Sequence, residues 1–154
     1  MTEVTDESAS QVEALVTAGE MAFGAGEVDK AEALFREAIA ADPLHVVAMN
    51  NLGVLKHHTG DLAEAERHLL RAALFSGNPA DVLVNLAAAS QAQGQLTAAT
   101  EYLRLAITSV GETPRILEQM ASLAEIMGDA TNAAVLRAKS AAMTEQEGSG
   151  EADQ

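Results

Sequence analysis

The sequence predicts an all-α solenoid of four helix–turn–helix repeats, and three observations support this fold class. Glycines recur with an unbroken spacing of 34 residues, at Gly26, Gly60, Gly94 and Gly128. Between them, apolar residues recur at spacings of three and four, which is typical of amphipathic helices. Hydrophobic residues make up 48% of the chain but aromatic residues only 3%, so the core must be aliphatic and rich in alanine. A helix pair this short cannot bury its apolar face alone, so successive pairs must stack.

The period extends to the small and apolar positions around each glycine. Five residues after the glycines stand Ala31, Ala65, Ala99 and Ala133. The core positions of the preceding helices are Leu15, Met49, Leu83 and Leu117, and four residues after these stand Gly19, Gly53, Ala87 and Ala121. Small side chains at fixed helical positions allow the two helices of a pair to approach closely, so each copy is predicted to be a helical hairpin.

The repeats divide the chain in order. They are predicted at residues 12–45, 46–79, 80–113 and 114–143. The first helices (A helices) are expected near residues 12–24, 45–58, 79–92 and 113–126. The second helices (B helices) are expected near residues 28–41, 62–75, 96–109 and 130–143. The recurrent glycines provide the tight turn inside each hairpin.

Capping residues agree with these starts. The pairs Asp42–Pro43, Asn78–Pro79 and Thr113–Pro114 each place a capping side chain before a proline that suits the first turn of an A helix. Asp61, with Glu64 three residues later, resembles a capping box at the start of a B helix. A terminal repeat needs a polar outer face, and we expect Arg137, Lys139 and Ser140 to form it.

The chain is strongly acidic, with a formal net charge of −14. This charge argues against nucleic acid or an anionic membrane surface as a partner. The segments 1–11 and 144–154 are acidic and polar, and we expect them to be disordered tails. The first ten residues do not resemble a secretory signal, and no apolar run is long enough for direct membrane insertion. The absence of cysteine excludes disulfides and thiolate metal sites and fits a cytoplasmic protein.

The second copy resembles the tetratricopeptide repeat family at almost every small or apolar position of MNNLGVLKHHTGDLAEAERHLLRAA, residues 49–73. The resemblance extends over residues 12–145. It implies a right-handed α-solenoid whose A helices line a concave groove, where partners usually bind. The sequence departs from the family at one position of each repeat, where the family usually has a tyrosine. This position is occupied here by Ala22, Lys56, Ser90 and Ala124.

The resemblance implies a non-catalytic scaffold or adaptor that binds a peptide segment or helix of a partner protein. The residues expected to line its groove are Asn50, Asn51, Val54, His57, Asp81, Val84, Asn85, Ala88, Gln91, Arg115, Glu118, Gln119 and Ser122. Asn51 and Asn85 lie one repeat apart, and a carboxamide can pair with any peptide bond. Such a ladder could hold an extended peptide by its backbone, with binding centred on copies two and three.

Other kinds of site are less well supported. A clamp for a C-terminal carboxylate needs several cationic donors, and in copies two to four only Asn85 and Arg115 fit. The neighbouring residues His57 and His58 point about 100° apart on a helix, so no metal site is predicted and His57 is expected to be a pH-sensitive groove residue. No catalytic arrangement or cofactor motif is found, so the chain is not expected to be an enzyme.

Two alternative functions remain open. The alanine-rich last helix could pack on a copy of itself, which would make the chain a self-associating assembly module and a possible homo-oligomer. The chain could also be a small cytoplasmic chaperone for a secreted or assembling subunit. The methionines are expected to fill the core instead of forming a binding surface; they are Met21, Met49, Met120, Met127 and Met143.

Overall fold

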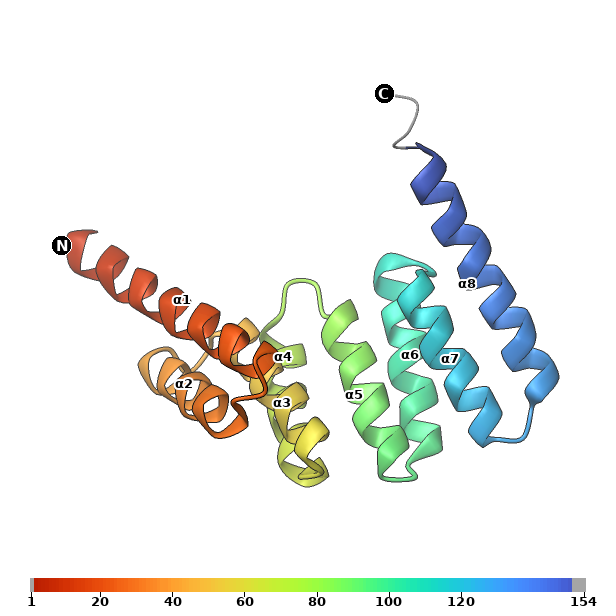
Figure 1. The fold of residues 1–154 in the computed structure, drawn as a ribbon, viewed down its shortest axis with the longest axis horizontal. Helices are drawn as coiled ribbons and strands as arrows, with labels where there is room; N and C mark the ends of the chain where they lie inside the picture. Colours follow the sequence, from red (N-terminus) through yellow and green to blue (C-terminus); the bar gives the residue numbers. More distant parts are fainter. Residues whose placement is uncertain (1, 151–154) are drawn as a thin grey trace. The chain divides into compact units, whose positions relative to one another are not determined.

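The computed structural model describes the backbone of residues 2–150 and the side chains of residues 7–146 and 148. This part of the chain forms eight α-helices and no strand (Figure 1). The chain divides into two compact units, residues 1–77 and residues 78–154. Unit 1 contains α1 (Thr2–Gly24), α2 (Val28–Ala41), α3 (Val46–Thr59) and α4 (Leu62–Phe75). Unit 2 contains α5 (Ala80–Ala92), α6 (Leu96–Val110), α7 (Pro114–Ile126) and α8 (Ala130–Gly150).

Each unit consists of two helical hairpins that pack on each other. In unit 1, α1 pairs with α2 and α3 pairs with α4, while α3 also packs against α1 and α2. In unit 2, α5 pairs with α6 and α7 pairs with α8, while α7 also packs against α5 and α6. The odd-numbered helices are thus the A helices of the predicted repeats, and the even-numbered ones are the B helices.

The turn within each hairpin contains the periodic glycine, as predicted. The backbone at Gly26, Gly60, Gly94 and Gly128 has φ angles of 77°, 86°, 74° and 82°. These values lie in the left-handed region, which glycine enters without the steric cost that other residues incur. The B helices start within a few residues of this turn, and α2 and α4 have the predicted bounds.

The helix starts are only partly as predicted. Thr113 caps α7, since its Oγ1 accepts the amide of Ile116 at 3.3 Å. Asp61 caps α4 in the same way. The start of α3 differs from the prediction, because His45 and not Asp42 is its N-cap and accepts the Ala48 amide through Nδ1. The Asp42 carboxylate instead accepts the amide of Leu44, within the turn.

The terminal helices are longer than expected. Residues 2–11 continue α1 and residues 144–150 continue α8, although their composition predicted disordered tails. No glycine or proline interrupts the sequence between Thr2 and Ala18, so helix propagation meets no breaker there. Residues 1 and 151–154, which complete the two predicted tails, lie outside the described residues.

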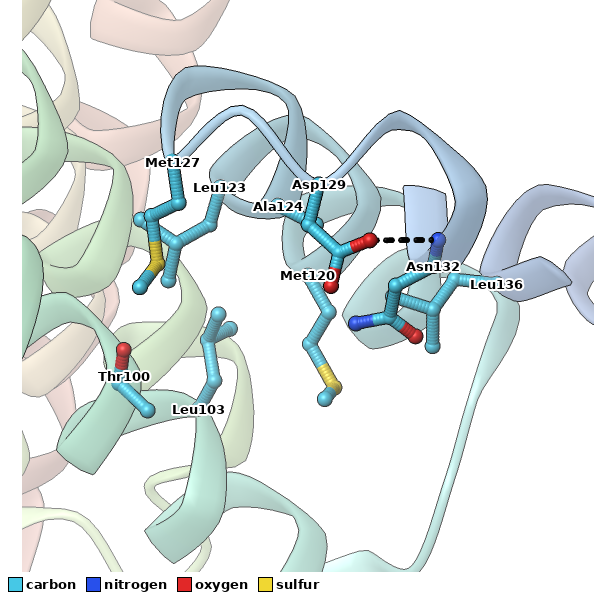
Figure 2. Close-up of a pocket in the computed structure, with 9 residues that line it drawn as sticks. All are labelled: Thr100, Leu103, Met120, Leu123, Ala124, Met127, Asp129, Asn132 and Leu136. Atoms are coloured by element: carbon cyan, nitrogen blue, oxygen red, sulfur yellow. Dashed lines mark hydrogen bonds between the residues drawn. The ribbon is translucent and has the colours of Figure 1, made fainter. Parts of the chain in front are cut away.

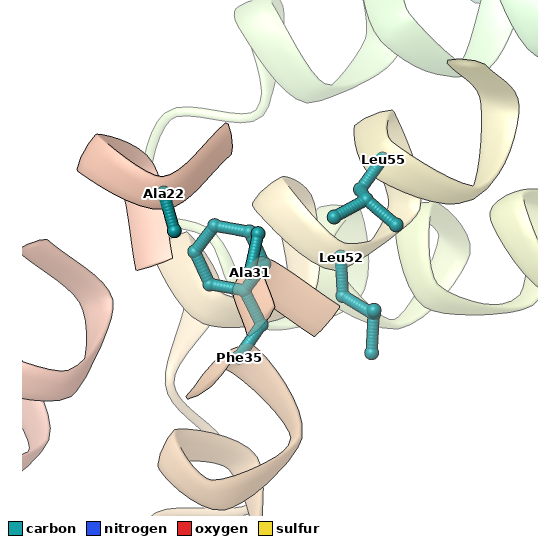
Figure 3. Close-up of a cluster of buried hydrophobic side chains, with 5 residues drawn as sticks. All are labelled: Ala22, Ala31, Phe35, Leu52 and Leu55. Atoms are coloured by element: carbon teal, nitrogen blue, oxygen red, sulfur yellow. The ribbon is translucent and has the colours of Figure 1, made fainter. Parts of the chain in front are cut away.

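The core of unit 1 is built around Phe35, which is fully buried. It packs with Ala22, Ala31, Leu52 and Leu55 from α1, α2 and α3 (Figure 3). Within the second hairpin, α4 approaches α3 so closely at Gly53 that a Cβ atom there would lie 2.6 Å from Cγ of Leu69. The small residues of the period therefore do what the sequence predicts, which is to bring paired helices into contact.

The core of unit 2 lacks an aromatic residue at its centre. It is formed by buried aliphatic side chains, among them Leu86, Leu103, Ile116 and Leu117. A smaller cluster of Ala121, Ala124 and Ala133 joins α7 to α8.

Two expectations about the core and the cap are wrong. Met49 is buried as expected, but Met21 and Met127 are 72% and 62% exposed. Ser140, expected on the polar outer face of the last helix, is buried, and its hydroxyl donates to the carbonyl of Pro114 at 3.2 Å. None of the helices within the described residues is both long and apolar enough to cross a membrane.

Candidate functional site

In unit 2, three of the predicted groove residues come together where α5 and α7 lie side by side. Nη1 of Arg115 donates to Oδ1 of Asp81 at 2.6 Å, and Nη2 of Arg115 donates to Oδ1 of Asn85 at 2.5 Å. Asp81 and Arg115 occupy the same position in successive repeats, and Asn85 lies one helical turn after Asp81. Both charged side chains are solvent-exposed, so their ion pair is weak and exchangeable.

A second polar chain continues along the same pair of helices. Nε2 of Gln91 donates to the hydroxyl of Ser122 at 2.9 Å, and Nε2 of Gln119 donates to Oε1 of Gln91 at 2.9 Å. All three side chains are half-buried. The predicted groove residues of copies three and four thus form a row of amides and charges that hydrogen-bond with one another.

A cavity of about 200 Å³ opens at the start of this row. Its walls include Asp81, Val84, Arg115 and Ile116, so charged groups flank an apolar floor. Val84, expected to be accessible in the groove, is 95% buried and contributes that floor. The remaining predicted residues of this unit are Ala88, which is half-buried, and Glu118, which is exposed.

In unit 1, the predicted residues are likewise engaged between A helices. Nδ2 of Asn51 on α3 donates to Oε1 of Glu20 on α1 at 2.7 Å. His45 accepts a backbone amide through Nδ1, so its Nε2 carries the proton and donates to Glu13 at 3.0 Å. Asn50 and Val54 are half-buried. Asn51 belongs to unit 1 and Asn85 to unit 2, so the amide ladder between them stays a prediction.

The adjacent histidines have different surroundings. Burial, with a smaller contribution from the neighbouring His58, lowers the pKa of His57 below its usual value. The ring of His58 makes an edge-on contact with Phe23, with centroids 5.7 Å apart. Among the described residues, no group of three or more His, Asp or Glu side chains could hold a metal ion.

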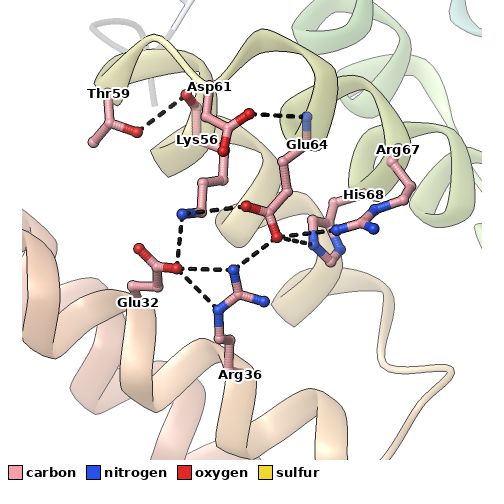
Figure 4. A network of polar contacts seen from close by, with 8 residues as sticks. All are labelled: Glu32, Arg36, Lys56, Thr59, Asp61, Glu64, Arg67 and His68. Carbon is pink, nitrogen blue, oxygen red and sulfur yellow. Dashed lines mark hydrogen bonds and ion pairs between the residues drawn. The ribbon is translucent and has the colours of Figure 1, made fainter.

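A charged cluster that the sequence analysis did not single out lies on the B-helix side of unit 1 (Figure 4). We call it the charge network; its members are Glu32, Arg36, Lys56 and Glu64. Nζ of Lys56 lies 2.7 Å from Glu32 and 3.3 Å from Glu64, and Arg36 lies 2.7 Å from Glu64. The Lys56 side chain is only 12% exposed. The one sequence signal for this cluster was a lysine at the position where the family has tyrosine.

The charge network changes the acidity of its members. The hydrogen bond from Arg36, followed by that from Lys56, lowers the pKa of Glu64 to about 2. The hydrogen bond from Lys56 also lowers the pKa of Glu32, and the pKa of Lys56 is raised in turn. All these groups therefore stay charged at neutral pH, and the network joins α2, α3 and α4.

His68 lies at the edge of the network and is almost fully buried. Its Nε2 is 3.5 Å from Oε1 of Glu64, and neither ring nitrogen makes a hydrogen bond to the described residues. Burial lowers the pKa of His68, although the nearby Glu64 opposes this. The imidazole is therefore neutral at neutral pH.

The sequence of this chain is similar to those of known repeat proteins. Two family models described as tetratricopeptide repeat match residues 16–81 and 80–110. The chain belongs to the tetratricopeptide repeat family. A human relative, tetratricopeptide repeat protein 7B, is 32% identical over 98 residues, which is 64% of this chain. The match covers only 12% of that protein's length, so it bears on the repeats and not on the larger protein's role.

Solved structures of tetratricopeptide repeat proteins have the same fold. The crystal structure of MamA matches 96% of this chain and 86% of that one, with a TM-score of 0.76 and 19% identity. The pilus biogenesis factor PilW matches 87% of this chain and 62% of that one, with a TM-score of 0.79 and 23% identity. Cut9, in the complex with Hcn1, matches 94% of this chain and 27% of that chain, with a TM-score of 0.82 and 15% identity. These matches confirm the α-solenoid fold class.

Proposed function

We propose that this tetratricopeptide repeat protein is a non-catalytic scaffold that binds a peptide segment of a partner protein on its A-helix faces. The fold itself supports a role in protein–protein interaction. The observation that carries the finer proposal is the row of polar side chains on α5 and α7, beside a cavity with an apolar floor. We include a cytoplasmic location in this proposal, since the sequence has no cysteine.

The chemistry of this row suits an extended peptide. Gln91, Gln119 and Asn85 offer both donors and acceptors, which match the amide groups of a peptide backbone of any sequence. Asp81 and Arg115 pair with each other at the surface, where an ion pair is worth about 0–1 kcal/mol. A partner can therefore replace this internal contact at little cost, and the adjoining cavity can accept one of its side chains.

Site-specific crosslinking tests the face that is used. A photoreactive residue at Ser122 on α7 should capture a partner in cells that naturally contain the chain, whereas one at the exposed Thr108 on α6 should not. The captured partner is then purified for binding measurements with variants. We expect Arg115→Ala to weaken binding about tenfold, since charge-assisted hydrogen bonds contribute about 1.5–3 kcal/mol. The matched Arg104→Ala on a B helix should leave the affinity unchanged.

The amide ladder has its own test. Replacing Asn51 and Asn85 together by alanine should weaken binding of the same partner more than either replacement alone. Unchanged affinity of the double variant would eliminate the ladder while leaving the scaffold role intact. Equal crosslinking from Ser122 and Thr108 would instead contradict binding on the A-helix face.

Self-association is a second candidate, favoured by one observation. Val135 on α8 is 61% exposed and lies in the alanine-rich part of that helix. If α8 packs on a second copy, the sedimentation coefficient should increase with concentration, and Val135→Asp should abolish the increase. A mass that stays monomeric at all concentrations would dismiss this candidate.

A further inference from the structure

In each unit, the two B helices are separated by a space that borders on the A helix of the second hairpin. These helices are α2, α4 and α3 in unit 1, and α6, α8 and α7 in unit 2. In unit 1 this space lies between α2 and α4 above α3. The charge network occupies the part around Lys56 (Figure 4), and a cavity of about 210 Å³ remains beside it, lined by Arg36, Ile39, Ala40, Leu52 and His68. In unit 2 the corresponding residues follow two 34-residue repeats later in the sequence. The two spaces are therefore built on the same repeat positions and can be compared residue by residue.

In unit 2 the corresponding space is an open apolar cavity of about 200 Å³ (Figure 2). It is lined by Thr100 and Leu103 of α6, by Met120, Leu123 and Ala124 of α7, and by Met127, Asp129, Asn132 and Leu136 at and after the following turn. An apolar cavity of about 150 Å³ is enough to bind benzene. The space in unit 2 is therefore large enough for one hydrophobic side chain.

The cavity lies where the charged side chains of unit 1 have shorter or uncharged counterparts in unit 2. The equivalent pairs are Glu32 and Thr100, Lys56 and Ala124, Glu64 and Asn132, and His68 and Leu136. In each pair except the last, the unit 2 side chain is shorter or has lost its charge. The change from Lys56 to Ala124 removes the long side chain from the middle of the space.

The remaining arginine does not fill the gap. Arg36 crosses from α2 to Glu64 on α4, but its counterpart Arg104 pairs with Glu101 on its own helix, at 2.8 Å. Both Arg104 and Glu101 are largely exposed. Among the residues that line the cavity, Asp129 is therefore the one that carries a charge.

We propose that the unit 2 cavity is a docking site for an unbranched or γ-branched apolar side chain, methionine or leucine, of a partner protein segment that carries a lysine or arginine beside it. The site lies on the B-helix side and goes beyond the peptide-binding face proposed above. Unit 1 shows the shape that fits, because the alkyl chain of Lys56 occupies the equivalent space there. Without Glu32 and Glu64, however, the unit 2 space lacks the two carboxylates that hold the ammonium of Lys56, so its occupant is apolar.

Two further features specify the occupant. Met120 and Met127 form part of the wall, and methionine adapts its shape to a bound side chain. Asp129 is the charged residue of the lining; one of its carboxylate oxygens accepts the Asn132 amide at 3.0 Å, and the other lies on the side of Met120 (Figure 2). Residues 78–154 contain ten acids and four bases. This charge attracts a basic residue next to the apolar one.

The test uses methionine methyl groups as reporters in the full chain. The protein is labelled with ¹³C in its methionine methyl groups, and an amidated helical peptide of alanine and lysine with one central methionine is added. We expect the methyl signals of Met120 and Met127 to shift saturably, while that of the buried Met49 in unit 1 stays in place. The same peptide with alanine in place of its methionine should bind roughly tenfold or more weakly, because less apolar surface is buried.

Variants separate docking from a loss of folding. Ala124→Lys restores the side chain found at Lys56 and should abolish the shifts, whereas the same change at the exposed Ala138 should not. Met127→Thr, which copies Thr59, alters an exposed side chain and should weaken binding several-fold without loss of helicity. Both variants are checked by circular dichroism and by the unchanged Met49 signal.

Four results would overturn the proposal. They are the absence of shifts at Met120 and Met127, equal shifts with both peptides, and unaltered binding by folded Ala124→Lys or Met127→Thr. The fourth is saturable binding of 1-hexanol without binding of the methionine peptide, which would assign the cavity to a small lipophilic molecule.

Discussion

The spaces between the B helices differ between the two units, although both are built on the same repeat positions. In unit 1, Lys56 and Arg36 meet two carboxylates between three helices, and the cavity that remains beside them borders on Arg36 and His68. In unit 2, the same repeat positions leave an apolar cavity edged by Met127 and Asp129. Both units keep the same helix order, glycine turns and small core residues. The comparison indicates that the 34-residue repeat pattern determines the helical hairpins, whereas the residues between the B helices can vary. They can form either a stabilising ion-pair network or an apolar cavity.

The largest effect is expected from the core aromatic that distinguishes unit 1. Phe35→Ala should lower the free energy of unfolding of unit 1 by about 3–5 kcal/mol, since it empties the centre of a packed cluster. Urea unfolding followed by circular dichroism measures this. Phe75 is 51% exposed, so Phe75→Ala is the matched control and should cost less than about 1 kcal/mol. Similar costs for the two variants would show that Phe35 is not the centre of the core.

A smaller effect is expected when the charge at the centre of the network is removed. Lys56→Met keeps the alkyl chain but leaves Glu32 and Glu64 without their ammonium, which should cost about 1–3 kcal/mol. Urea unfolding again provides the measurement. Lys30, 63% exposed and paired with Glu27 on the surface, offers the control Lys30→Met, with an expected change below about 0.5 kcal/mol. A stabilising effect of Lys56→Met would mean that desolvation of the network outweighs its attraction.

The two equivalent arginines provide a direct comparison between the units. Arg36→Gln should lower the unfolding free energy by about 0.5–1 kcal/mol, a value reduced by the partial exposure of Arg36 to solvent. Arg104→Gln should produce no measurable change, because Arg104 pairs with an exposed neighbour on its own helix. Thermal melts of both variants, at low and at high salt, test this. Equal losses would remove the distinction that we draw between the two spaces.

The smallest expected effect is on the pH dependence of the unfolding free energy, which arises in part from His68. Because burial lowers its pKa in the folded state, the unfolded chain takes up the proton first as pH falls. Stability is therefore lost as pH decreases below about 6.5, the ordinary histidine value. His68→Leu, which copies Leu136 of unit 2, should flatten this dependence when urea midpoints are compared between about pH 7.5 and about pH 5.5. His57 also has a lowered pKa, so the flattening is partial, and an unchanged slope would contradict the prediction.

The sequence predicted the hairpins well and the contacts between them poorly. The glycine spacing predicted the turns because a left-handed backbone conformation favours glycine. Small residues such as Gly53 predicted where the paired helices come into contact. Start signals were less decisive: Asp42 and His45 both can cap, and only the path of the turn selects between them. The charge network was not predicted from the sequence, because its members lie on three helices in two different repeats. Its only local trace was Lys56 at a position expected to be aromatic.

That the candidate site binds a partner stays a prediction, but the positions of its residues can be compared with the sequence. The A-helix frame correctly placed Asp81, Asn85 and Arg115 near one another, but not their mutual hydrogen bonds, which depend on rotamers. The exposure of Met127 was missed because hydrophobicity alone does not reveal whether a neighbouring side chain covers it.

The constant 34-residue spacing of the glycine turns has a consequence for insertions and deletions. Adding or removing one residue within a helix rotates all later residues of that helix by about 100° around its axis. In α3, such a change would carry Gly53 away from Leu69 and turn a bulkier neighbour into the contact. Changes in chain length are therefore tolerated as whole 34-residue copies, or in the connectors 76–79 and 111–113 that precede α5 and α7.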